Sequence, residues 1–270
     1  MPPLNLTIAY SPCPNDMFVF HDLASGTLRL HGCQLQVSLH DVQTLNELAQ
    51  DARYDVTKLS LPAYLRVRSK YQMLRSGAAM GFGCGPVVVA ARAIARDDLA
   101  SCRVAIPGEL TTAHLLFQLW APRVAETLFV RYDKIMDLVA AGQVDAGVII
   151  HESRFVYPSK GLGLVVDLGQ WWQDQTGLPV PLACIAARRT LGQETIAAFD
   201  SLLQEAVENS MSHPEATLPY VAQSATEMDE AVLRKHIATF VNDYTLNIGP
   251  DGHEAVRRLE AMAQAAGLLP

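Results

Sequence analysis

His151 and Glu152 are adjacent ionisable residues that directly follow an apolar stretch over residues 146–150. That stretch places small and β-branched side chains around one glycine, which is typical of a strand buried on both faces. Ligands of open α/β sheets bind beyond the carboxyl ends of strands, so His151 lies where chemistry would be done. Histidine is a suitable base near neutral pH. A histidine at this place can equally be a core or loop residue without a chemical role, and this strand alone leaves both interpretations open.

A second polar strand end is predicted at Lys58, Leu59 and Ser60, which close the strand-like stretch 54–60. The strand end offers a cation and a hydroxyl group to an anionic ligand. A surface lysine is usually only solvated, so the interpretation as a binding site depends on the other polar groups nearby.

Two expected helix starts add backbone N–H groups. Ser11, Asn15 and Asp16 follow a strand over residues 4–10 and precede a helix expected from about 17 to 25, and Thr111 and Thr112 open a helix that runs to about 122. Free N–H groups and the positive end of a helix dipole suit a carboxylate or phosphate. Ordinary helix capping is the alternative, but two such starts would face each other if two lobes close.

Four glycines lie within residues 77–85, in a segment that ends at Pro86. Such a loop lets the backbone approach a ligand closely or swing as a hinge, and a conformationally demanding connection is an equally good interpretation. The segment lacks the Gly-Lys-Ser/Thr ending of a P-loop and does not follow a Rossmann first strand, so no nucleotide cofactor is predicted.

Composition narrows the class of protein. The chain has 270 residues, half of them apolar, and a net charge of −7 without a basic stripe, which argues against a nucleic-acid partner. No apolar run approaches the roughly 20 residues of a membrane span. The five cysteines are scattered without C-x-x-C spacing, and no H-E-x-x-H motif occurs, so neither a disulfide framework nor a metal site is predicted. The N-terminal residues lack the features of a secretory signal, and we expect a cytoplasmic protein.

The order of expected elements predicts an α/β fold with two lobes. Residues 1–90 plus 189–270 are expected to form the first lobe and residues 91–188 the second, with hinge crossings near 86–92 and 183–188. Beyond residue 188 the pattern is helical. This describes a periplasmic-binding-protein-like (type II) clamshell with a central cleft. Without an export signal, such a chain is expected to be a ligand sensor or an enzyme.

Five motifs together resemble the 1,4-dihydroxy-6-naphthoate synthase family of the futalosine route to menaquinone. They are Ser-Pro-Cys-Pro-Asn-Asp at 11–16, Lys-Leu-Ser at 58–60, Leu-Arg-Ser-Gly-Ala-Ala at 74–79, Thr-Thr-Ala at 111–113 and Ile-His-Glu at 150–152. The resemblance covers most of the first 190 residues, whereas the last 80 match only in being helical. Met17 departs from the pattern, because a small hydroxyl residue is expected there.

The resemblance implies a cofactor-free carbon–carbon lyase that converts cyclic dehypoxanthinyl futalosine to 1,4-dihydroxy-6-naphthoate. His151 would be the proton acceptor, and Lys58 to Ser60 with Thr111 and Thr112 would hold the anionic substrate, next to the turn with Ser11, Asn15 and Asp16. The alternatives are a chorismate dehydratase of the same pathway and a cytosolic binding module without catalysis. A homodimer is compatible with the sequence.

Overall fold

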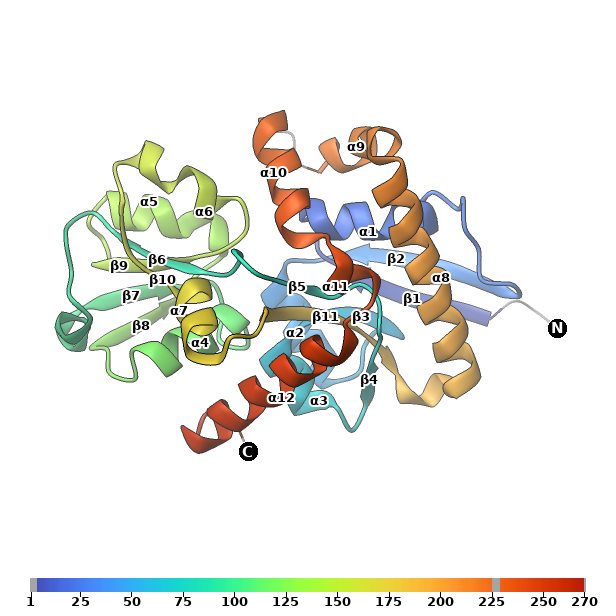
Figure 1. Cartoon of the computed structure of the whole chain (residues 1–270), viewed down its shortest axis with the longest axis horizontal. Helices are drawn as coiled ribbons and strands as arrows, with labels where there is room; N and C mark the ends of the chain where they lie inside the picture. Colours follow the sequence, from blue (N-terminus) through green and yellow to red (C-terminus); the bar gives the residue numbers. More distant parts are fainter. Residues whose placement is uncertain (1–3, 225–228, 270) are drawn as a thin grey trace.

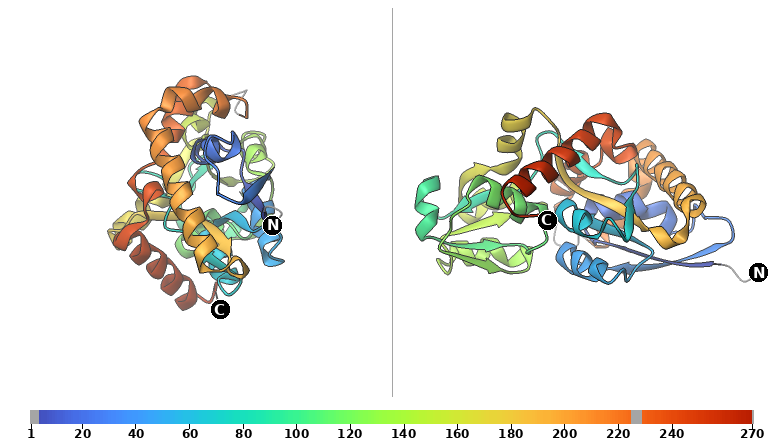
Figure 2. Two further views of the ribbon diagram at one scale, coloured as in Figure 1. Left: turned by 90° about the vertical axis from the view of Figure 1, so that its right-hand side faces the viewer. Right: turned by 90° about the horizontal axis from the view of Figure 1, so that it is seen from below.

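The structure is a computed structural model that describes residues 4–224 and 229–269. Its strands form two separate sheets, and each sheet lies in its own lobe of an elongated molecule (Figure 1). The view from below shows the same division, with the helices of the C-terminal third lying mostly over the first lobe (Figure 2). The predicted α/β fold class is confirmed.

The first sheet contains strands from both halves of the chain. Its order is β2-β1-β3-β11-β4, with β5 also paired to β11. The strands are β1 (Leu4–Tyr10), β2 (Cys33–Leu39), β3 (Val56–Ser60), β4 (Tyr71–Met73), β5 (Ala79–Gly81) and β11 (Val180–Arg188). The parallel strands β1, β2 and β3 are linked through helices, and the long strand β11 returns antiparallel to β3.

Helices cover both faces of this sheet. Side chains alternate between the two faces of a strand, so each face contributes to its own apolar core. Ile185 and Ala187 of β11 pack into a core with α1 and α8, whereas Cys184 and Ala186 belong to the core on the opposite face. The helices of this lobe are α1 (Pro14–Ala24), α2 (Val42–Gln50), α3 (Leu61–Val67), α8 (Gln193–Ser212), α9 (Pro214–Ala222), α10 (Glu230–Phe240), α11 (Asp243–Leu246) and α12 (Gly249–Ala265).

The second sheet has the order β10-β6-β9-β7-β8. Its strands are β6 (Val87–Ala90), β7 (Arg103–Ile106), β8 (Glu126–Phe129), β9 (Ala146–Ile149) and β10 (Gly163–Asp167). Its helices are α4 (Thr112–Trp120), α5 (Ile135–Ala140), α6 (Ser153–Val156) and α7 (Leu168–Thr176). Short 3₁₀ turns occupy Arg96–Ser101, Tyr132–Lys134, Tyr157–Lys160 and Arg189–Leu191.

Strand β9 is the central strand of the second sheet, and all four of its residues are buried. Gly147 is needed there, because a Cβ atom on it would lie 2.4 Å from Cγ2 of Ile135 in α5. The strand therefore delivers His151 from the middle of the sheet, as the apolar pattern predicts.

One large core cluster joins the lobes. It contains Leu59 of β3, Val104 of β7, Leu116 of α4 and Leu259 of α12. Helix α12 contacts both α3 and α4, and Figure 1 shows it running beneath the gap between the lobes. The C-terminal helix therefore connects the two lobes.

Three local expectations differ from the structure. Helix α1 begins at Pro14 and not near residue 17, because proline fits the first turn of a helix without losing a hydrogen bond. Residues 87–90 already pair within the second sheet, and residues 180–188 already lie in the first, so the chain crosses earlier than 86–92 and 183–188.

Candidate active site

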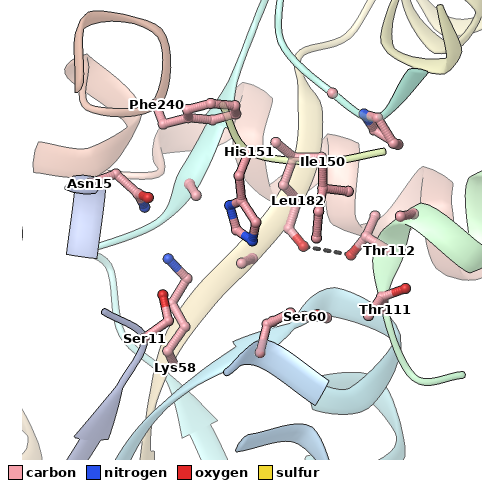
Figure 3. A pocket seen from close by; sticks show the side chains of 16 residues that line it. Ser11, Asn15, Lys58, Ser60, Thr111, Thr112, Ile150, His151, Leu182 and Phe240 are labelled. Atoms are coloured by element: carbon pink, nitrogen blue, oxygen red, sulfur yellow. Dashed lines mark hydrogen bonds between the residues drawn. The ribbon is translucent and has the colours of Figure 1, made fainter. Parts of the chain in front are cut away.

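A cavity with about 630 Å³ of empty space lies between the lobes, and most of the predicted site residues line it (Figure 3). Ser11, Asn15, Lys58 and Ser60 come from the first lobe. The predicted residues Thr111, Thr112 and His151 come from the second. The remaining lining residues are Val42, Ala79, Gly85, Pro86, Ala113, Ile150, Leu182, Ala183 and Phe240.

The first-lobe wall is built around the carboxylate of Asp16, which is 1% exposed. Its Oδ2 accepts a hydrogen bond from Oγ of Ser11 at 2.6 Å, and its Oδ1 accepts one from Nδ2 of Asn15 at 2.8 Å. Oδ1 also pairs with the ammonium group of Lys58, so the buried cation is neutralised within the wall. The backbone N–H of Ser11 donates to Oδ2 as well, at 3.3 Å.

Two predicted binding residues do not line the cavity. Asp16 lies behind Lys58 and holds it, so the first-turn position expected to receive a ligand anion is filled by the protein's own carboxylate. Leu59 points to the opposite face of β3 from Lys58 and Ser60, and its side chain is fully buried in the core. Met17 is likewise buried in the core of the first lobe.

The Thr111–Thr112 turn starts α4 as predicted. Oγ1 of Thr111 caps the helix by accepting a hydrogen bond from the backbone N–H of His114 at 3.2 Å. Oγ1 of Thr112 donates to the carbonyl of Leu182 and accepts from the N–H of Leu61 at 3.2 Å. Thr112 therefore ties the second lobe to β11 and to the start of α3.

Helix α2 makes a second connection to the same turn. Oε1 of Gln43 accepts a hydrogen bond from the N–H of Leu110 at 3.1 Å, and Nδ2 of Asn46 donates to the Leu110 carbonyl at 3.3 Å. Asn46 also exchanges hydrogen bonds with Ser60 at 2.9 and 3.0 Å. A side chain at Gly108 would collide with Gln43, because its Cβ atom would lie 2.3 Å from Oε1. This contact requires glycine at position 108.

His151 occupies a left-handed backbone conformation, with φ of 56°. Only a few per cent of residues other than glycine adopt it, although histidine does so more often than most, so the conformation indicates a locally constrained backbone. Nε2 of the imidazole lies 3.6 Å from Sγ of Cys13, and the ring contacts Tyr132 edge-on with centroids 4.9 Å apart. The histidine therefore reaches from the end of β9 to the first turn of α1.

Burial lowers the pKa of His151 below its usual 6.5 and is the largest influence on it. The carboxylates of Glu152 and Asp16 oppose this shift by favouring the imidazolium, whereas the ammonium of Lys58 reinforces it. The imidazole is thus neutral at pH 7 and can accept a proton. Burial raises the pKa of the neighbouring Cys13 thiol to about 12, which keeps the thiol protonated.

Helix α10 contributes site residues that the sequence did not predict. Phe240 lines the cavity, and the buried His236 stacks near His151 with ring centroids 6.1 Å apart. Nζ of Lys235 lies 4.6 Å from the ring centre of Phe155 in α6, a further contact between the lobes. The signal for His236 in the sequence was its place on an apolar helix face. Local pattern alone assigns such a histidine to the core.

The glycine segment combines the two interpretations given for it. Gly85 lines the cavity at φ of 127°, and a Cβ atom on it would lie 2.8 Å from Cα of Gly169. The segment is thus a demanding connection that also brings backbone to the cavity.

Among residues 4–224 and 229–269, no three His, Cys, Asp or Glu side chains are placed to hold a metal ion. In the same part of the chain, no helix is long and apolar enough to cross a membrane.

Comparison of the chain with known protein families identifies its family. A family described as menaquinone biosynthesis matches residues 6–265, nearly the whole chain. The protein belongs to this menaquinone biosynthesis family. The family predicted from the motifs is therefore confirmed.

Two curated relatives of the menaquinone family extend along almost the full chain. A 1,4-dihydroxy-6-naphthoate synthase from Thermus thermophilus is 46% identical over 263 residues, with 97% of this chain and 95% of the relative covered. A protein of the same name from Streptomyces coelicolor is 42% identical over 271 residues, with 98% and 95% covered.

Solved structures support the fold of this family member. A protein from Archaeoglobus fulgidus superimposes with a TM-score of 0.93 at 34% identity, covering 98% of both chains. The alkanesulfonate-binding protein SsuA from Xanthomonas axonopodis, bound to MOPS, has a TM-score of 0.74 at 15% identity, with 100% and 96% covered. The second similarity concerns the fold only, and it confirms the predicted periplasmic-binding-protein-like architecture.

Proposed function

We propose that this protein is a 1,4-dihydroxy-6-naphthoate synthase, a lyase that cleaves cyclic dehypoxanthinyl futalosine in menaquinone biosynthesis. The observation that carries the proposal is a single cavity that His151 and Lys58 enter from opposite lobes. His151 is the proposed base, and Lys58 is the proposed cation. The relatives that bear this enzyme name match nearly the full chain, which supports the assignment.

The cavity is suited to a small molecule. Its lining is mostly apolar, with a few polar side chains contributed by both lobes, as is usual for ligand pockets. Lys58 already pairs with Asp16, so an anionic substrate would share the ammonium group with this carboxylate. Further donors for the anion are the N–H groups at the start of α4, beside Thr111 and Thr112.

The chemistry assigned to His151 is proton abstraction. Cleavage of a carbon–carbon bond next to a carbonyl needs a base that is neutral at working pH, and the lowered pKa of His151 meets this need. Negative charge that develops on the substrate oxygen would be stabilised by Lys58 and by N–H groups at the start of α4. Glu152 acts through its charge on the imidazole and not as a second base.

A cytoplasmic location is part of the proposal. All five cysteines are free, and four of them are buried, which is compatible with a reducing compartment. The absence of a nucleic-acid partner stays a prediction from the sequence, and a homodimer stays compatible with it.

The test is an incubation of purified protein with cyclic dehypoxanthinyl futalosine, in which the naphthoate is followed by its absorbance. We expect turnover by the parent and a loss of roughly 10²-fold or more in His151→Ala. His213→Ala, which removes an exposed histidine, is the matched control and should behave as the parent.

Three results would contradict parts of the proposal. Turnover that survives His151→Ala would remove His151 from the role of base. A parent protein that forms no naphthoate, but dehydrates chorismate, would be the sister enzyme of the pathway. A protein that binds the futalosine derivative without turning it over would be a binding module.

A further inference from the structure

We propose that His236 is a positioning residue, which fixes the side-chain amide of Asn15 so that one of its N–H bonds is directed to the substrate. The inference rests on the proposed function, because it concerns the same cavity. It adds a contribution from the C-terminal helices, a part of the chain without a recognised site motif.

The hydrogen bonds determine the orientation of Asn15. Nδ2 of Asn15 lies 2.8 Å from Oδ1 of Asp16, and Oδ1 of Asn15 lies 3.0 Å from Nε2 of His236. The reverse orientation would place the amide oxygen against a carboxylate, which is repulsive. The amide oxygen therefore faces His236.

This orientation also determines the tautomer of His236. An amide oxygen only accepts hydrogen bonds, so Nε2 of His236 must carry the proton and donate it. In the neutral ring, Nδ1 is then an unprotonated acceptor. Nδ1 is buried and has no hydrogen-bond partner among the described residues. Such a polar atom is costly to bury, which suggests that the histidine is retained for the bond made by its other nitrogen.

The surroundings of His236 hold the ring in place. The side chain is 0% exposed and contacts the ring of Phe240, with centroids 4.7 Å apart. Burial lowers its pKa well below 6.5, and the nearby His151 and Lys58 act in the same direction. The ring thus stays neutral and keeps one donor.

The consequence for the cavity follows from the number of donors on Asn15. Its Nδ2 has two hydrogen atoms, and Asp16 accepts one of them. Asn15 lines the cavity, so the second hydrogen is available to an oxygen atom of the substrate. In Figure 3 the Asn15 side chain lies at the same end of the cavity as Phe240 and Lys58.

The test compares His236→Phe, which keeps an aromatic ring, with His236→Gln, which keeps an N–H donor near the former Nε2. We expect kcat/KM for cyclic dehypoxanthinyl futalosine to fall about tenfold in the Phe variant, the scale of one lost hydrogen bond. The Gln variant should recover most of this loss. Thermal unfolding of both variants reports whether they fold as the parent does.

A double-mutant cycle tests whether His236 acts through Asn15. In Asn15→Leu the donor itself is absent, so adding His236→Phe should lower kcat/KM no further. Additive losses would overturn the inference. A Phe variant with parental activity and an impaired Gln variant would overturn it too, because ring stacking near His151 would then be the important contact.

Two measurements separate this inference from the proposed function. Binding of 1,4-dihydroxy-6-naphthoate, measured by calorimetry, should weaken in parallel in Asn15→Leu and His236→Phe. Nitrogen-15 NMR of the histidine rings should show His236 protonated on Nε2, with or without activity. A parent without turnover would refute the proposed function alone, whereas an Nδ1-protonated His236 would refute the positioning role alone.

Discussion

The two walls of the cavity differ in how their polar groups are held. In the first lobe, Ser11, Asn15 and Lys58 all donate to the buried carboxylate of Asp16. In the second lobe, the ring of His151 has a single hydrogen-bonding contact in the described parts of the chain, 3.6 Å from the Cys13 sulfur. A dense network makes a rigid surface for binding, whereas a weakly bonded imidazole retains a lone pair for a proton. The first wall is therefore organised to bind, whereas the second combines the hydrogen-bonded turn at Thr111 and Thr112 with an imidazole that is free to react.

The largest expected effect comes from breaking the network of the first wall. Lys58→Met leaves the Asp16 carboxylate buried without its counter-ion, so the free energy of unfolding should fall by about 3–5 kcal/mol. Turnover should also be lost with the cation. Urea denaturation and the naphthoate assay measure the two effects.

A double variant sharpens this first prediction. Lys58→Met with Asp16→Asn removes both charges and should regain most of the stability without regaining turnover. If the single variant proves as stable as the parent, Asp16 does not depend on Lys58 and the description of this wall as a charge-centred network is wrong.

The second prediction concerns the backbone that presents His151. At φ of 56° a residue with a Cβ atom is strained, so His151→Gly should be more stable than His151→Ala by about 1–2 kcal/mol. Chemical denaturation of the two inactive variants gives the difference. Equal stabilities would mean that the strand end relaxes easily and does not hold the imidazole.

The third prediction concerns the contact between the walls. Gln43→Ala removes the acceptor for the Leu110 N–H, an interaction of about 1 kcal/mol, and should raise KM a few-fold while kcat changes little. Gln34→Ala, an exposed glutamine on β2 in the same lobe, is the matched control. A parental KM in Gln43→Ala would show that this contact does not help to close the cavity.

The smallest expected effect is a shift in pH dependence. A base acts in its neutral form, so activity is lost as the pH falls through the pKa of His151. Because burial lowers this pKa, the acid limb of kcat/KM should lie below pH 6.5. Glu152→Gln removes a charge that favours the imidazolium, so the limb should move to still lower pH.

The control for the pH profile is Glu109→Gln, which removes an exposed carboxylate from the same lobe without altering the charges that act on His151. Its acid limb should coincide with that of the parent. A limb that moves to higher pH in Glu152→Gln would contradict the proposed electrostatic arrangement.

The sequence alone determined the parts of this protein that depend on short-range pattern. The buried strand before His151 follows from consecutive apolar residues, and the cap at Thr111 follows from a hydroxyl group before a helical run. Lys58 and Ser60 lie at a strand end and line the cavity, as the same reasoning predicts. These features are visible locally, because period and capping depend on residues a few positions apart.

Tertiary structure alone decided which of these groups meet and what each one faces. Asp16 and Lys58 are 42 positions apart, and Asn15 and His236 are 221 apart, so no local pattern could pair them. Leu59 was assigned to the site with its neighbours, but the alternation of side chains along β3 turns it into the core. The role of α10 was missed for the same physical reason: a histidine on an apolar helix face becomes a site residue only through the surface against which the helix packs.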